Sequence, residues 1–163
     1  MPLPLETQIG ANAPTDAMEM KMRIGLLVAG AVMAMAVAAP AAAKDVQVRM
    51  LNNGNGRAMV FSPEVVRIAP GDTVTFVATD KGHNAEIIST MIPAGAAPFK
   101  GKMNQNVTVK FTKPGTYGYK CLPHYGMGMV GAVIVGNGAP NAAQAKAVSH
   151  PGKAKQIFAS IFK

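Results

Sequence analysis

Hydrophobic and polar residues alternate over much of the chain between positions 45 and 135. Residues 46–50 and 107–111 each place an apolar side chain at every second position, which is the period of a half-buried β-strand. A third run, 129–136, is almost wholly apolar. Clusters rich in Gly, Asn and Pro separate these runs, as at 52–57 and 70–72. The pattern predicts seven or eight short strands, arranged as a mainly β protein of the β-sandwich type.

The pattern changes after Gly138. Residues 139–150 are rich in strong helix formers, and Pro151 limits how far that helix can extend. Residues 153–163 then place two Ile-Phe pairs, 157–158 and 161–162, on one stripe of a second helix. Both helices are too short to be stable alone. We therefore expect residues 139–163 to fold back as a helical pair that covers one face of the sandwich.

Residues 1–43 resemble a targeting segment more than a folded unit. Lys21 and Arg23 precede an uncharged run that ends in small residues at 40–43. This order of basic, apolar and small residues is typical of a secretory signal peptide, here with a cut after Ala43. An uncleaved membrane anchor is the alternative, because about 20 apolar residues can span a bilayer. Pro40 and the Ala-rich end favour cleavage.

Cleavage would release residues 44–163, a length that suits one monomeric domain without stable membrane association. The chain carries sixteen Lys and Arg residues against eight Asp and Glu, a formal charge of +8. A basic surface favours an acidic partner, although it can also serve solubility alone. The basic residues are dispersed rather than clustered, and the protein is expected in the periplasm. Both features argue against nucleic acid as the partner of this protein.

Cys121 is the only cysteine of the chain, so it cannot form an internal disulfide. A free thiol in an oxidising compartment is prone to oxidation unless it is buried or bound to a metal. Within the next eight residues lie His124, Met127 and Met129, and His83 precedes a predicted strand. Two imidazoles, a thiolate and a weak axial thioether are the ligands of a type 1 copper site, whereas zinc sites usually combine Cys and His alone.

The pattern of these residues resembles that of the cupredoxins, the blue copper proteins. The motif "GHN" at 82–84, followed by C-x-x-H-x-x-x-x-M at 121–129, resembles the pseudoazurin branch, as does the helical pair. The resemblance covers about 44–163 and implies a Greek-key β-sandwich of about eight strands. It implies His83, Cys121, His124 and Met129 as ligands of one copper. Met127 would fit the shorter amicyanin-like spacing and stays an alternative to Met129.

The resemblance also implies functions for residues around the copper. Asn84 would tie the two ligand loops together and donate toward the thiolate. A docking patch would surround His124, with the apolar residues Pro123 and Met127 ringed by Lys81, Lys100, Lys102 and Lys120. Other residues are expected to be structural: Met50, Met59, Met91 and Met103 as core or loop filler, and His150 at a helix end, interacting with the helix dipole.

Four protein ligands would leave no open coordination position, and catalytic metal sites keep one. We therefore expect a one-electron carrier and not an enzyme. The implied partner is an acidic redox protein such as a nitrite reductase or a c-type cytochrome. A copper storage or delivery protein is the alternative, since the same soft ligands would serve it. A thiol hydrolase using Cys121 and His124 lacks a third group to orient the base. Because all four candidate ligands precede Gly136, the sequence also predicts a metal loop that does not depend on the helices.

Overall fold

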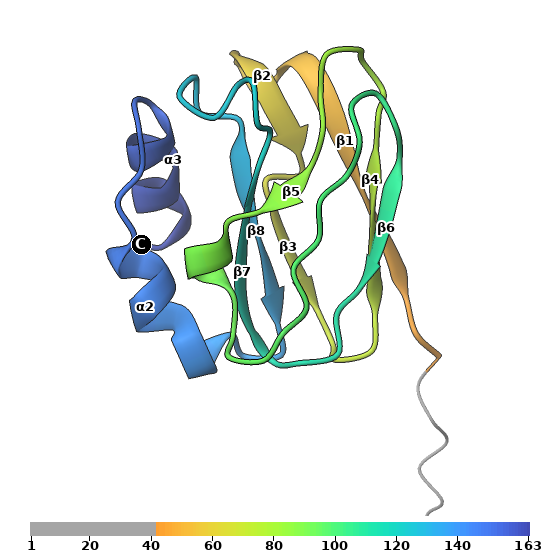
Figure 1. Cartoon of the computed structure of the whole chain (residues 1–163), viewed down its shortest axis with the longest axis vertical. Helices are drawn as coiled ribbons and strands as arrows, with labels where there is room; N and C mark the ends of the chain where they lie inside the picture. The colour runs from red at the N-terminus through yellow and green to blue at the C-terminus, as the bar shows by residue number, and fades with distance from the viewer. Residues whose placement is uncertain (1–41) are drawn as a thin grey trace, which may run out of the picture. The chain divides into compact units, whose positions relative to one another are not determined.

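A computed structural model describes residues 42–163 of the chain (Figure 1). The predicted signal peptide therefore lies outside the described residues, apart from its last two positions. No helix within 42–163 has the length and apolar character needed to cross a membrane.

Within residues 42–163, eight strands form two four-stranded sheets that face each other (Figure 1). The first sheet has the order β2-β1-β4-β6, and the second has the order β3-β8-β7-β5. The strands are β1 (Asp45–Gly54), β2 (Arg57–Ser62), β3 (Val65–Ile68), β4 (Thr73–Val77), β5 (Glu86–Ile87), β6 (Val107–Lys110), β7 (Gly115–Lys120) and β8 (Val130–Val135).

The chain passes back and forth between the two sheets, so that two of the strand pairs are parallel. β1 pairs with β2 in an antiparallel hairpin but with β4 in parallel, in the register Val48↔Phe76. β3 likewise pairs in parallel with β8, while β7 and β8 are antiparallel neighbours. The predicted mainly β sandwich with two C-terminal helices is thus confirmed.

The core between the sheets consists of alternate residues of facing strands. Val48 and Met50, which the alternation assigned to the inner face of β1, are fully buried. Tyr119 lies at the centre of an aromatic cluster, with its ring centroid 4.8 Å from those of both Phe61 and Phe76. Edge-to-face contacts of this kind add to the apolar area that the rings bury. Cys121, directly after β7, belongs to the same buried core as this cluster.

The two predicted helices are α2 (Ala142–Ala147) and α3 (Ala154–Ile161), and a 3-10 turn, η2 (Ala139–Asn141), precedes them. They pack on the outer face of the second sheet, α2 against β7 and α3 against β8 (Figure 1). A second buried cluster fills this interface, with Phe158 only 2% exposed above Val130 of β8 and Met91 of η1 (Ser89–Met91). The apolar stripe of 157–162 faces this cluster, as its spacing predicts.

Three details differ from the sequence-based expectations. The turn expected at 52–57 is confined to residues 55–56, because β1 continues to Gly54. The extended run after residue 83 contributes only two residues of strand, β5, before the chain turns into η1. His150 lies beyond the end of α2, which ends at Ala147, and so it does not face that helix's dipole as expected. The four methionines expected as core or loop filler do lie in such places: Met50 and Met91 are fully buried, Met59 is half-buried, and Met103 is exposed on a loop.

Candidate metal centre

Two loops at one end of the sandwich carry the candidate ligands. His83 lies between β4 and β5, while Cys121, His124 and Met129 lie on the connection from β7 to β8. Main-chain hydrogen bonds close this second loop, because the Cys121 N–H donates to the Met129 carbonyl (3.0 Å) and the Met129 N–H donates to the His124 carbonyl (3.2 Å). The spacing of the motif is therefore the length of a closed turn that begins and ends at a candidate ligand.

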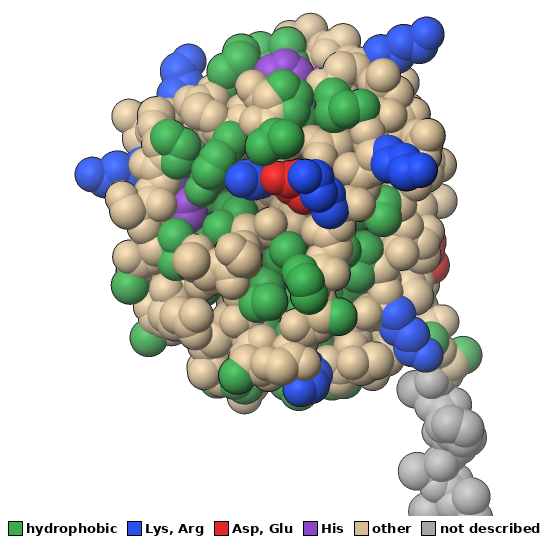
Figure 2. All heavy atoms as spheres, in the orientation of Figure 1, with side chains coloured by type: hydrophobic (Ala, Val, Ile, Leu, Met, Phe, Trp, Pro, Cys, Tyr) green, Lys and Arg blue, Asp and Glu red, His purple; other side chains and the backbone are tan. Residues whose placement is uncertain are grey.

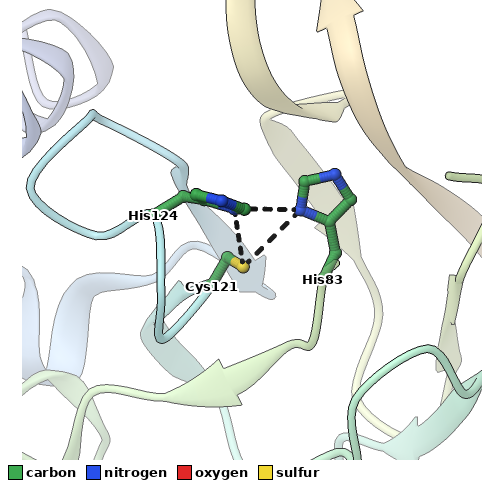
Figure 3. A group of neighbouring side chains, drawn as sticks. All are labelled: His83, Cys121 and His124. Atoms are coloured by element: carbon green, nitrogen blue, oxygen red, sulfur yellow. Dashed lines mark hydrogen bonds between the residues drawn. The ribbon is translucent and has the colours of Figure 1, made fainter. Parts of the chain in front are cut away.

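His83, Cys121 and His124 point toward one another and form a triangle of donor atoms (Figure 3). The Cys121 Sγ lies 3.7 Å from His83 Nδ1 and 3.6 Å from His124 Nδ1, and the two nitrogen atoms are 3.1 Å apart. Metal–nitrogen and metal–sulfur bonds of about 2.0 and 2.3 Å in a trigonal plane would place nitrogen and sulfur roughly 3.7 Å apart. The side chains present thus fit one small metal ion with two nitrogen ligands and one sulfur ligand.

The triangle is largely shielded from water. His83 and Cys121 are fully buried, and His124 is half-buried. Burial raises the pKa of the Cys121 thiol, while the main-chain N–H groups of Asn84 and His124 favour the thiolate. Burial, and then the neighbouring His124, lower the pKa of His83, which keeps that imidazole neutral and able to bind a metal. A bound cation would supply the positive charge that a buried thiolate otherwise lacks.

Asn52 contacts the His83 ring, and nothing in the sequence predicts this contact. The amide oxygen of Asn52 lies 2.9 Å from His83 Nε2, so Nε2 carries the proton and Nδ1 keeps its lone pair for the centre of the triangle. Asp80 in turn accepts a hydrogen bond from the Asn52 N–H (2.6 Å). Both hydrogen bonds of Asn52 join β1 to the loop that carries His83, and no local pattern in the sequence indicates them.

Asn84 joins the two ligand loops, as the resemblance implied. Its amide oxygen accepts a hydrogen bond from the Leu122 N–H (2.8 Å), and its amide nitrogen donates to the Gly101 carbonyl (3.3 Å). The main-chain N–H of Asn84 lowers the pKa of the Cys121 thiol and so favours the thiolate, against the opposing effect of burial. Asn84 therefore links its own loop to the loop that carries Cys121, through the hydrogen bond from Leu122.

Glu86 pairs with two of the four lysines expected to ring the docking patch. Its carboxylate is buried, and it lies 3.5 Å from Lys120 Nζ and 4.0 Å from Lys100 Nζ. Figure 2 shows an acidic side chain between two basic ones on this face. Lys120 also lies over the ring of Tyr125, 4.8 Å from its centroid. These two lysines therefore have a structural role besides any role in docking.

The two methionines of the loop lie in different environments. Met129 is fully buried and belongs to the same buried cluster as Cys121, whereas Met127 is 48% exposed. A weak axial ligand of a type 1 site has to lie beside the buried ligand plane. The environments therefore favour Met129 over the alternative, Met127.

Apolar side chains surround the exposed edge of His124. Leu122 is 51% exposed and Met127 is 48% exposed, and Pro123 between Leu122 and His124 is exposed as well. Figure 2 shows hydrophobic side chains gathered around a histidine at the upper edge of the view. Pro123 and Met127 were expected in this patch. Leu122 was not expected there, although its position directly after Cys121 indicates it. Lys81 and Lys102 are also exposed, and each lies on a loop that borders His83.

Comparisons with known proteins agree with this geometry. A family model described as copper binding proteins of the plastocyanin/azurin family matches residues 48–136. A pseudoazurin of Methylorubrum extorquens is 52% identical over 80% of this chain and 88% of its own length. A pseudoazurin of Paracoccus pantotrophus is 50% identical over 68% of this chain and 76% of its own. The crystal structure of native pseudoazurin from Hyphomicrobium denitrificans superposes with a TM-score of 0.70 at 43% identity, covering 72% of this chain and 95% of that one.

The fold and the donor set together define a cupredoxin, a small copper-binding electron carrier. Identities near 50% over most of the chain narrow the class further. The chain belongs to the pseudoazurins.

Proposed function

We propose that the protein is a periplasmic one-electron carrier in which His83, Cys121, His124 and Met129 hold a single type 1 copper. The observation that carries this proposal is the largely buried Cys121–His83–His124 triangle, with Met129 in the same core cluster as Cys121. Copper supplies one-electron chemistry by cycling between its two common oxidation states. The protein contributes a set of ligands whose positions are fixed by main-chain hydrogen bonds and by Asn52 and Asn84.

The closed character of the site favours electron transfer over catalysis and over copper delivery. A catalytic metal site keeps a position open for substrate, and four protein ligands here would fill the coordination sphere. Burial of His83 and Cys121 excludes water from two of those ligands. The same burial would slow exchange of the metal, which does not suit a protein that hands copper to others.

Electrons would enter and leave through His124. Its ring is half-buried, so one edge faces the copper ligands and the other faces solvent within the patch of Leu122, Pro123 and Met127. An apolar patch of this kind can dock closely against a partner after modest desolvation. The basic side chains nearby would favour an acidic redox protein, of which a nitrite reductase and a c-type cytochrome are the two candidates.

Export is part of the same proposal. Residues 1–43 carry the order of basic, apolar and small residues of a signal peptide, and β1 begins at Asp45, the second residue after the expected cut. The mature protein would be residues 44–163, with the helical pair at 139–163. We expect it to be a monomer without stable membrane association, as suits a carrier that diffuses between partners.

Replacement of Met129 by leucine tests the axial ligand. We expect Met129→Leu to keep copper but to raise its reduction potential, because a weak donor to the metal is removed. Met127→Leu is the matched control and should leave both the visible spectrum and the potential close to those of the wild type, since Met127 is half exposed. Cyclic voltammetry of the two variants measures this. The opposite pair of results would show that Met127 is the axial ligand.

The basic surface predicts a rate of electron transfer that depends on salt. Electrostatic steering acts mainly on the association rate and raises it by roughly tenfold or more at low ionic strength. The Debye length falls to about 8 Å at 0.15 M salt, so exposed charges are then strongly screened. We expect the second-order rate with an acidic cytochrome or reductase, followed by stopped flow, to decrease steeply as salt is added.

Lys102→Glu is the variant best suited to test this steering. Lys102 is exposed and forms no ion pair among residues 42–163, whereas Lys100 and Lys120 contact Glu86. The variant should lower the rate several-fold at low salt and leave the visible spectrum intact. Lys110→Glu is the control, because Lys110 lies at the far end of β6, paired with Thr73. A rate that is flat with salt and equal in both variants would leave the basic surface with a role in solubility alone.

A further inference from the structure

The loop between His124 and Met129 lies against the segment that joins α2 to α3 and against the first turns of α3 (Figure 1). We refer to residues 148–163 as the helical arm. Three successive parts of the loop contact it, at Tyr125, Gly126 and Gly128. This arrangement differs from the sequence-based expectation of a metal loop that is independent of the helices.

The central contact joins two stretches of main chain. The Lys153 N–H donates a hydrogen bond of 2.9 Å to the Gly126 carbonyl. Gly152, immediately before it, approaches the same carbonyl so closely that a Cβ at position 152 would lie 2.3 Å from the Gly126 oxygen. Gly152 also has φ +50°, in the left-handed region that favours glycine. Position 152 therefore requires glycine for two independent reasons, and one of them is the proximity of the loop.

The other two contacts lie on either side of this one. The Tyr125 hydroxyl and His150 Nδ1 are 2.7 Å apart, and the His150 ring packs on Phe158 with centroids 4.2 Å apart. A Cβ on Gly128 would lie 3.2 Å from Ile157 Cγ1, a tight contact, so a side chain at that point of the loop would press on α3. The arm thus meets the loop on its outer side from the residue after His124 to the residue before Met129.

We infer that the helical arm is a positioning element for the metal, and that Gly152 and Lys153 set where His124 and Met129 lie through their contact with Gly126. The inference rests on the ligand set of the proposed function. Inside the loop, the N–H groups of Met127 and Met129 both donate to the His124 carbonyl. A displacement of Gly126 would therefore be passed to residues on both sides of it, including the axial thioether. Small changes in axial ligation alter the reduction potential of type 1 sites.

Gly152→Ala tests the inference, with Gly136→Ala as the matched control. Gly136 has a similar left-handed φ of +65°, but the nearest atom to a Cβ there is Pro114 Cβ at 3.7 Å, an ordinary contact. Both variants carry the conformational cost of a side chain at positive φ, and only Gly152→Ala pushes on the loop. We expect Gly152→Ala to shift the reduction potential and the visible bands, and Gly136→Ala to leave both unchanged.

Hydrogen exchange in the metal-free protein gives a second readout. The amides of Met127, Gly128 and Met129 are hydrogen-bonded within the loop. In Gly152→Ala they should exchange roughly tenfold faster, because the loop loses its main-chain contact with the arm. They should exchange at the wild-type rate in Gly136→Ala. Equal behaviour of the two variants in potential and in exchange, whether both change or neither does, would overturn the inference.

If Gly152→Ala does not fold, a second pair of variants, Ile157→Ala and Ile161→Ala, tests whether the arm positions the loop. Both isoleucines lie on the apolar stripe of α3 and are half-buried, but only Ile157 approaches the loop, at Gly128. Faster loop exchange in Ile157→Ala alone supports the inference, and equal exchange in the two variants contradicts it. A wild-type protein that binds copper without intense visible absorption would instead refute the proposed function, and the exchange experiment would still report on the contact between arm and loop.

Discussion

Replacing Cys121 with serine is expected to abolish the intense visible absorption of the copper-loaded protein. This absorption arises from the bond between the thiolate and copper, and a serine hydroxyl is a harder and poorer ligand for that metal. Cys121 is the only thiol in the chain, so no other residue can replace it. Its sulfur lies within 3.7 Å of both His83 Nδ1 and His124 Nδ1, at the corner of the triangle. The change should therefore be a complete loss rather than a shift of the band.

Circular dichroism of the metal-free variant provides the control for this loss. Serine is close to cysteine in size, so the sandwich should fold and only the ligand should be missing. A folded Cys121→Ser protein without the band supports the assigned site. A variant that keeps the wild-type spectrum would show that the copper is bound elsewhere.

Phe158→Ala is expected to cause the largest loss of stability of any single change in the helical arm. Phe158 is 2% exposed and fills the second buried cluster, between α3 and the strand β8. Truncation of a buried phenylalanine removes its transfer free energy and leaves a cavity, which together cost about 3–5 kcal/mol. Urea denaturation of the metal-free protein measures this as a lower midpoint at an unchanged slope.

Phe162→Ala is the matched control for this change. Phe162 stacks on Phe158 with centroids 5.8 Å apart, but it is only half-buried at the end of the chain. Phe162→Ala should lower the free energy of unfolding markedly less than Phe158→Ala does, because less buried apolar area is lost and water can fill the space. Equal and small effects of both changes would mean that the arm contributes little to the free energy of unfolding.

The hydrophobic pattern predicted where the strands and helices lie in the sequence better than it predicted which strands pair with each other. Alternation at 46–50 correctly gave the buried face of β1, and the turn at 70–72 correctly separated β3 from β4. The parallel pairing of β1 with β4 and of β3 with β8 was not predictable, because alternation reports burial of a face and not the neighbouring strand. The shortness of β5 has the same origin, since it depends on how long the chain stays beside β7.

The candidate site was predictable where its chemistry is local. Cys121, His124 and Met129 lie within nine residues, and their types alone indicate copper. His83 is distant in sequence, and the structure places it in the triangle because the β4–β5 loop meets the β7–β8 loop. Asn52 could not be identified, because its contact with His83 joins residues 31 positions apart and an asparagine near a turn has many other uses.

His150 shows how a local rule can predict the wrong role. α2 ends at Ala147, where the next residue, Val148, is already extended, so His150 lies three residues beyond the helix. His150 then packs against Tyr125 and Phe158, and burial lowers its pKa, whereas the negative end of a helix dipole would have raised it. The contact with Tyr125 brings the helical arm to the metal loop, a link that no periodicity in the sequence predicts.

The most direct test of the account is a reductive titration of purified protein that holds one copper per chain. We expect an intense blue or green colour in the oxidised protein that bleaches with a single electron equivalent and returns on reoxidation. The colour should be absent from Cys121→Ser. A one-copper protein that is nearly colourless, or whose copper is lost in a redox cycle, would contradict the assignment of His83, Cys121, His124 and Met129 as the ligands of an electron-transfer site.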